Sequence, residues 1–239
     1  MSLLTSLRKR FLLIGTLLVF ALGAALLGVS VTHESPSAAA ATVATPEHDH
    51  GDGKPPTIKT AAQLAFHDQM RKLWEDHVTW TRLAIVTFAA GTQGFDTTAA
   101  RLLQNQVDIA NAFKPFYGDA TAARLASLLH DHITIAVEIL QAAKAGDTNA
   151  VNEASARWYA NANEIADFWA SINPHFWPAA VMRADMKVHL DQTLAEAVDE
   201  LQGNFAAGVT EYEAVHLHIL NMADMLSNGI MGQFPNRFK

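Results

Sequence analysis

The 239-residue sequence contains no cysteine. This absence excludes disulfides, thiolate metal sites, iron–sulfur clusters, covalently attached c-type haem and cysteine nucleophiles. Any metal ion must therefore be held by imidazole, carboxylate, amide or water. Patterns typical of a Ser-His-Asp triad, a Walker-type phosphate loop or a dinucleotide-binding fingerprint are also missing.

Charge is scarce as well. Only 17% of the residues are charged, the formal net charge is −7, and the globular part has no stripe of Lys and Arg. This balance argues against nucleic acid as a partner. Hydrophobic residues make up 50% of the chain, so it can bury a core of ordinary size.

The first 60 residues divide into three segments. Residues 1–10 carry three consecutive basic residues and are expected in the cytoplasm, and residues 11–31 form an uncharged apolar run long enough to cross a bilayer. We expect a single-pass membrane anchor with everything after it outside the cytoplasm, or a secreted protein if the run is cleaved as a signal. Residues 32–60 read as a flexible tether. Its His48 and His50 either form a short tract that attracts metal ions or are simply part of a solvated linker.

Residues 61–239 predict an all-α domain, because the apolar residues recur at helical spacing and no alternating strand pattern is present. Short connections favour an up-and-down bundle of four long core helices with one or two further helices. No fixed-period repeat is apparent. Pro115 and the turn at residues 116–118 are expected to end the second helix. The expected helices span about 61–90, 97–114, 119–145, 148–173, 178–203 and 206–231.

Four of these helices carry a histidine near their midpoint, on or beside the apolar stripe: His77, His132, His189 and His216. Antiparallel helices of similar length place their midpoints in one layer of a bundle. We therefore expect the four imidazoles to converge. Asn105 and Asn161, on the two remaining helices, should lie beside them.

Converging imidazoles in a dry interior must be largely neutral, because protonated rings would repel one another and lose their hydration. A transition-metal ion can satisfy several of their nitrogens together, and copper or zinc is favoured, with iron or nickel also compatible. The candidate ligands are His77, His132, His189 and His216, with His130 or His218 for a second or dinuclear site. The candidate partners of the outward ring nitrogens are Asp76, Asn105, Asp108, Asn161 and Thr193.

Short motifs are spread along the whole region after the tether: Leu73-Trp74 with His77, Trp80-Thr81-Arg82, residues 102–109, residues 115–118, residues 142–147, residues 158–161, Asn173-Pro174, His189 with Thr193, and residues 215–220 ahead of residues 222–224. In these motifs residues 61–239 resemble a group of bacterial helical-bundle proteins of uncharacterised activity. Members carry labels such as glycosyltransferase or acetylglutamate kinase. The resemblance implies a helical bundle with grouped histidines and supplies no activity.

Three functions follow from this pattern. The leading one is an exported, membrane-tethered bundle that binds a transition metal for handling, storage or sensing. The second is a metal-dependent enzyme with an open coordination position and Glu211, Asp108 or Asn161 as a polar helper. The third is a structural or partner-binding bundle with a buried His/Asn network and no metal, or a pH switch. A bis-histidine haem site is also conceivable. The sequence identifies no catalytic residue and no protein partner.

Overall fold

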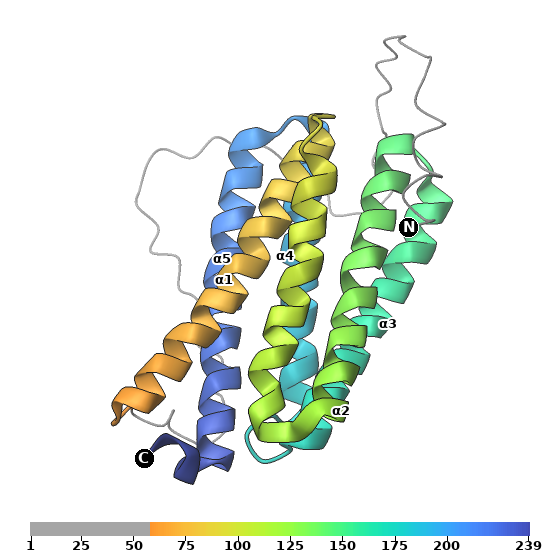
Figure 1. The fold of residues 1–239 in the computed structure, drawn as a ribbon. Coiled ribbons are helices and arrows are strands. Elements are labelled where there is room, and N and C mark those ends of the chain that lie inside the picture. Colours follow the sequence, from red (N-terminus) through yellow and green to blue (C-terminus); the bar gives the residue numbers. More distant parts are fainter. Residues whose placement is uncertain (1–57) are drawn as a thin grey trace, which may run out of the picture. The chain divides into compact units, whose positions relative to one another are not determined.

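A computed structural model of the chain describes residues 58–239, which form five α-helices and a short 3-10 helix and contain no strand (Figure 1). The all-helical prediction is confirmed for this part of the chain. The helices are α1 (Ala61–Ala89), α2 (Phe95–Ala145), α3 (Thr148–Ile172), α4 (Ala179–Gln202) and α5 (Phe205–Gln233), followed by η2 (Pro235–Phe238). The expected anchor at 11–31 and most of the expected tether lie outside the described residues. Within residues 58–239, no helix is long and apolar enough to span a membrane.

Helix α2 consists of two helical segments, residues 95–117 and 119–145, joined at Gly118. Gly118 has φ 83° and ψ 173°, a conformation that is essentially restricted to glycine. The predicted turn at residues 116–118 thus contains the break, whereas the helix continues about one turn beyond its predicted end at residue 114. Pro115 lies inside the first segment, because a proline removes one helical hydrogen bond without necessarily ending the helix.

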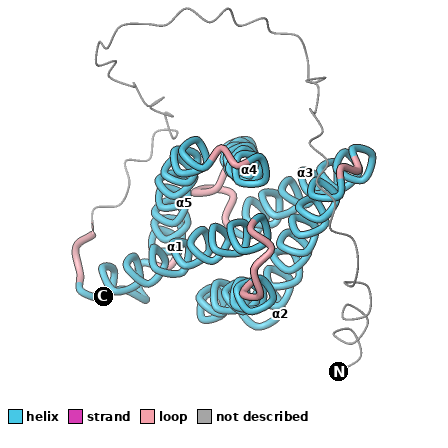
Figure 2. The backbone as a smooth tube through the Cα atoms, turned by 90° about the horizontal axis from the view of Figure 1, so that it is seen from above, coloured by secondary structure: helices cyan, strands magenta, loops and turns pink. Residues whose placement is uncertain are grey.

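The helical segments run alternately up and down in Figure 1 and pair as three hairpins. The first hairpin is α1 with residues 95–117, the second is residues 119–145 with α3, and the third is α4 with α5. Successive helices pack against each other and α5 packs against α1, which closes the ring seen from above in Figure 2. The first helices of the three hairpins all run in the same direction.

The three hairpins repeat one another. A glycine with positive φ follows each first-helix histidine by fourteen residues: Gly91 (φ 66°), Gly146 (φ 73°) and Gly203 (φ 78°). In each case the residue after the glycine donates its N–H to the carbonyl five residues before it, as in a Schellman cap. The repeat agrees with the expectation that no fixed period is present, because the matching histidines lie 55 and 57 residues apart. The second hairpin carries one more residue than the first between its glycine and the matching position of its second helix, and the connection to the third hairpin is one residue longer than the connection to the second.

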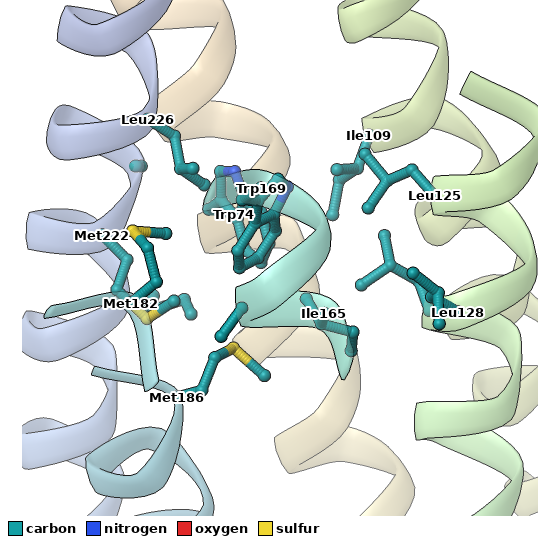
Figure 3. Packing of buried hydrophobic residues seen from close by; sticks show 14 of the residues in the cluster. Trp74, Ile109, Leu125, Leu128, Ile165, Trp169, Met182, Met186, Met222 and Leu226 are labelled. Atoms are coloured by element: carbon teal, nitrogen blue, oxygen red, sulfur yellow. The ribbon is translucent and has the colours of Figure 1, made fainter. Parts of the chain in front are cut away.

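Equivalent positions of the three hairpins form the layers of the core. Figure 3 shows many of these side chains pointing into the space between the helices. The matched buried sets are Met70, Leu125 and Met182; Trp74, Leu129 and Met186; Ile109, Ile165 and Met222; and Phe113, Trp169 and Leu226. One turn beyond the Trp74 layer, on the same three helices, lie the histidines His77, His132 and His189.

Replacement of Gly118 by alanine should destabilise the domain by about 1 to 3 kcal/mol, because an alanine at this φ and ψ is strained. The added Cβ would meet nothing within 4 Å, so the loss comes from the backbone alone. Urea unfolding measures it. Gly94→Ala is the matched control, since Gly94 has φ −77° and its loss should be smaller; equal losses would contradict the strain argument.

Candidate functional site

Three of the four predicted histidines lie together in the interior. His77 on α1, His132 on α2 and His189 on α4 are 5%, 4% and 4% exposed. The ring centroids of His77 and His189 are 5.8 Å apart, and those of His132 and His189 are 6.1 Å apart. All three come from the first helix of a hairpin. Because these helices are parallel and pack the same face inward, equivalent residues meet at the same level.

The ring of His132 is oriented by an asparagine on the partner helix of its hairpin. Asn161 donates its Nδ2 hydrogen to the Leu128 carbonyl, at 3.1 Å, which directs its Oδ1 toward His132 Nδ1, at 3.0 Å. A carboxamide oxygen only accepts, so His132 Nδ1 carries the hydrogen. The other nitrogen, Nε2, therefore carries the lone pair that a metal ion would need.

The same arrangement recurs in the other two hairpins. In the first, Asn105 donates to the carbonyl of Leu73, at 2.9 Å. In the third, His218 Nε2 donates to the carbonyl of Asp185, at 2.9 Å. Each of the three carbonyls belongs to the residue four positions before the buried histidine. We call Asn105, Asn161 and His218 the clamp residues; each fixes itself to the backbone one turn before the histidine beside which it lies.

Three buried polar atoms in this region lack a hydrogen-bond partner within residues 58–239. His77 Nδ1, Asn105 Oδ1 and His189 Nδ1 are buried and have no hydrogen-bond partner among the described residues. Asn105 nevertheless lies close enough to His77 to raise the pKa of His77, against the larger lowering by burial. Each unmade hydrogen bond of a buried polar atom costs about 1 to 3 kcal/mol. Both nitrogens are Nδ1 atoms, the position that in His132 is turned toward its clamp residue.

The three imidazoles are neutral at physiological pH. Burial lowers the pKa of His77 to about 4, although Asn105 opposes the shift. Burial and then the neighbouring His77 lower the pKa of His132 to about 3, against the effect of Asn161. Burial, followed by the charges of the neighbouring histidines, lowers the pKa of His189 well below its usual value. Each ring can therefore offer one lone pair.

A cavity of about 60 Å³ adjoins the three rings. His77, His132 and His189 line it together with Trp158, whose ring stacks on His132 at 5.2 Å and whose indole nitrogen donates to the His132 carbonyl. The rest of its wall is mostly aliphatic. The histidine cluster is thus open on one side.

The fourth predicted histidine, His216, is not part of this cluster. Its side chain is 27% exposed, stacks on Tyr212 with centroids 5.7 Å apart, and places Nε2 3.5 Å from Glu75 Oε1. Val215 and Ile219 face the core on α5. His216 follows Val215 by about 100° around the helix and so points to the flank of the bundle.

The other predicted partners divide into two groups. Thr193 donates its hydroxyl to the His189 carbonyl, at 2.8 Å, and so lies beside the cluster. Asp76 and Asp108 are partly exposed and lie on either side of Arg101, at 3.7 Å and 3.5 Å, away from the imidazoles. The two asparagines, rather than the two aspartates, lie against the buried rings.

The imidazoles are not arranged as a finished metal site. Within residues 58–239, no group of three or more His, Asp or Glu side chains is positioned to hold a metal ion. The ring nitrogens would need to turn toward a common point before a metal could bind to all three.

The sequence interpretation missed two features. One is His218 as the third clamp residue, which the repeated spacing of histidine and glycine could have revealed. The other is a buried charge network in which Arg82 lies 3.2 Å from Glu196 and 2.6 Å from Glu200. Burial raises the pKa of Glu196 to about 7 even though Arg82 opposes the shift. Two buried carboxylates thus share one guanidinium near the end of α4.

Asn161→Ala should lower the free energy of unfolding by about 1 to 3 kcal/mol, because the Leu128 carbonyl and His132 Nδ1 would both lose a buried partner. Asn163→Ala, on the exposed side of the same helix, is the matched control and should change stability by less than about 0.5 kcal/mol. Urea unfolding of both variants measures the difference, and equal losses would refute the clamp.

The histidine pKa shifts predict acid destabilisation of the metal-free protein. A histidine with a lowered pKa in the folded state binds fewer protons there than when unfolded, so its contribution is fully present above about pH 6.5. That contribution is lost as the pH falls toward 4 and below. The difference in unfolding free energy between the wild type and His132→Gln should shrink by about 1 to 3 kcal/mol between pH 7 and pH 4.

Comparison with the variant is needed because Glu196 acts in the opposite direction. Its raised pKa gives a contribution that is present below its unfolded value and lost as the pH rises toward 7. Subtracting the two pH profiles removes this common effect. A constant difference across this pH range would contradict the burial of a neutral His132.

Comparisons with known proteins identify no relative of this chain. No protein-family model, no curated protein and no solved structure matches the chain. The resemblance to bacterial helical-bundle proteins therefore remains an expectation from the sequence motifs. The geometry of the histidine cluster is therefore the basis for a functional proposal.

Proposed function

We propose that this protein binds a transition-metal ion through His77, His132 and His189, and that it handles, stores or senses that metal as an exported, membrane-tethered helical bundle. The observation that carries the proposal is the meeting of three buried, neutral imidazoles from three different helices. The apolar run at residues 11–31 supports the membrane tether.

The spacing of the rings supports this proposal. A metal about 2.1 Å from a ring nitrogen lies about 3.2 Å from the ring centroid, so two imidazoles on one metal have centroids about 5 to 6 Å apart. The separations of 5.8 Å and 6.1 Å are close to that range. The side chains would have to rotate to bring the three nitrogens to a common point.

The clamp residues support it as well. If a metal ion took the Nε2 lone pairs, Nδ1 of each ring would be left to donate toward its clamp residue, as in many histidine metal sites. Asn161 already orients His132 in this way. Imidazole ligands with no thiolate favour copper or zinc, and iron or nickel would also be accepted.

A second function, a metal-dependent enzyme, is favoured by one specific observation. Three imidazoles converge instead of four, and a cavity adjoins them. A catalytic metal typically has three protein ligands and one exchangeable position, whereas a structural metal is enclosed by four. Glu211 and Asp108, the carboxylates considered as helpers, do not line this cavity, so the helper would be Asn161 acting through His132.

Metal titration of the full-length protein tests the proposal. The background should be His48→Ala/His50→Ala, because these tether histidines could bind metal independently. We expect one equivalent of copper or zinc to bind and to raise the melting temperature. Replacing His77, His132 or His189 singly by alanine should weaken binding more than about 100-fold, because loss of an outer partner alone costs 10- to 100-fold.

His130→Ala and His216→Ala are the matched controls. Both histidines lie on the same helices as cluster residues or clamp residues, yet neither belongs to the cluster, so binding should be unchanged. The proposal fails if the protein takes up less than about a tenth of an equivalent of any transition metal and shows no thermal shift. That result would favour the metal-free His/Asn network.

A further inference from the structure

The cavity beside the histidine cluster has a chemical character of its own. It lies between α1, both segments of α2, α3 and α4, and its polar boundary consists of the three imidazoles, Thr81 and Thr193. The remaining wall is aliphatic apart from the ring of Trp158. No Asp, Glu, Lys or Arg among the described residues lines it.

The two threonines do not make this cavity polar. Thr81 donates its hydroxyl to the His77 carbonyl and Thr193 donates to the His189 carbonyl, both at 2.8 Å. The hydroxyl hydrogens are thus used within their own helices, one turn after each histidine. A charged ligand would lose its hydration in this cavity without gaining an ion-pair partner.

The volume limits the size of the occupant. A single water needs about 10 to 15 Å³, and an engineered apolar cavity of about 150 Å³ accepts benzene. At about 60 Å³ the cavity lies between these two cases and accommodates a molecule of two to a few heavy atoms. Ordered water is disfavoured at the aliphatic end of the cavity, because a buried water needs two to four polar partners and these lie only at the end lined by the imidazoles.

From this geometry we infer that the cavity binds a small uncharged molecule of about the size of dioxygen, held against the open side of the three imidazoles. This inference rests on the proposed metal site only for its role, which is to supply an exogenous ligand to the metal. The binding itself depends on the cavity and is measurable on the metal-free protein.

Dioxygen itself is the probe, because it is paramagnetic and speeds the relaxation of nearby nuclei. The full chain, in detergent micelles with a chelator present, carries labelled isoleucine δ1 methyl groups and is compared under nitrogen and under dioxygen. The reporters at the cavity are Ile85, Ile133 and Ile139, and the controls are Ile109, Ile165 and Ile219, which are buried elsewhere in the core. We expect the relaxation gain to be at least threefold larger at the cavity methyl groups.

A variant that fills the cavity provides the second measurement. Ala197→Leu adds side-chain volume at the wall and should remove the difference between the two sets of methyl groups, whereas Ala123→Leu on the exposed side of α2 should preserve it. Equal relaxation at all six isoleucines of the wild type would overturn the inference, and this comparison does not depend on whether the variant folds.

The result is independent of the metal titration. A dioxygen effect in a protein that binds no metal would leave the cavity site intact and refute the proposed metal function. Metal binding without any dioxygen effect would leave the proposed metal function intact and overturn the inference about the cavity.

Discussion

Burying three imidazoles together requires that all of them stay neutral. In an apolar interior a charged ring loses its hydration, and a second charge nearby raises the cost, which is why all three histidine pKa values are lowered. Neutral rings in turn need one donor and one acceptor partner each. Asn161 meets this need for one nitrogen of His132, and the cavity adjoins the three rings on the side where no group of residues 58–239 meets it.

The threefold repeat explains how the chain meets this constraint with ordinary helices. Parallel first helices bring equivalent positions to one level without any irregular backbone at the site, and irregularity is confined to the glycines that end helices. The carbonyl that each clamp residue contacts already accepts a hydrogen bond within its helix, and a carbonyl oxygen has a second lone pair to offer. The polar network is thus added to the helices without breaking them.

Helical periodicity predicted the fold class and most helix boundaries, because amphipathic spacing and capping residues are local properties of the sequence. The midpoint argument also placed His77, His132 and His189 together with Asn105 and Asn161. It misplaced His216 because a midpoint sets the height of a residue in the bundle but leaves its direction around the helix to a turn of about 100° per residue. The expected stop combined Pro115 with the turn at residues 116–118, and the helix breaks at Gly118 in that turn, because proline only weakens a helix locally whereas Gly118 redirects it.

What the sequence could not provide was partner choice between helices. Asp76 and Asp108 were as suitable chemically as the asparagines, yet Arg101 pairs with both on the outer side. The repeat was hidden because its two intervals differ by two residues, and because Leu, Trp and Met replace one another at equivalent core positions. Only superposing the hairpins by their glycines makes the clamp positions correspond.

The third hairpin differs from the other two in the chemical type of its clamp residue. Asn105 and Asn161 carry short carboxamides, whereas His218 fills the same position with an imidazole ring that donates from Nε2 to the Asp185 carbonyl. An imidazole ring occupies more volume than a carboxamide. The contact between α4 and α5 at this level is therefore built around a larger and flatter side chain than the equivalent contacts of the other two hairpins.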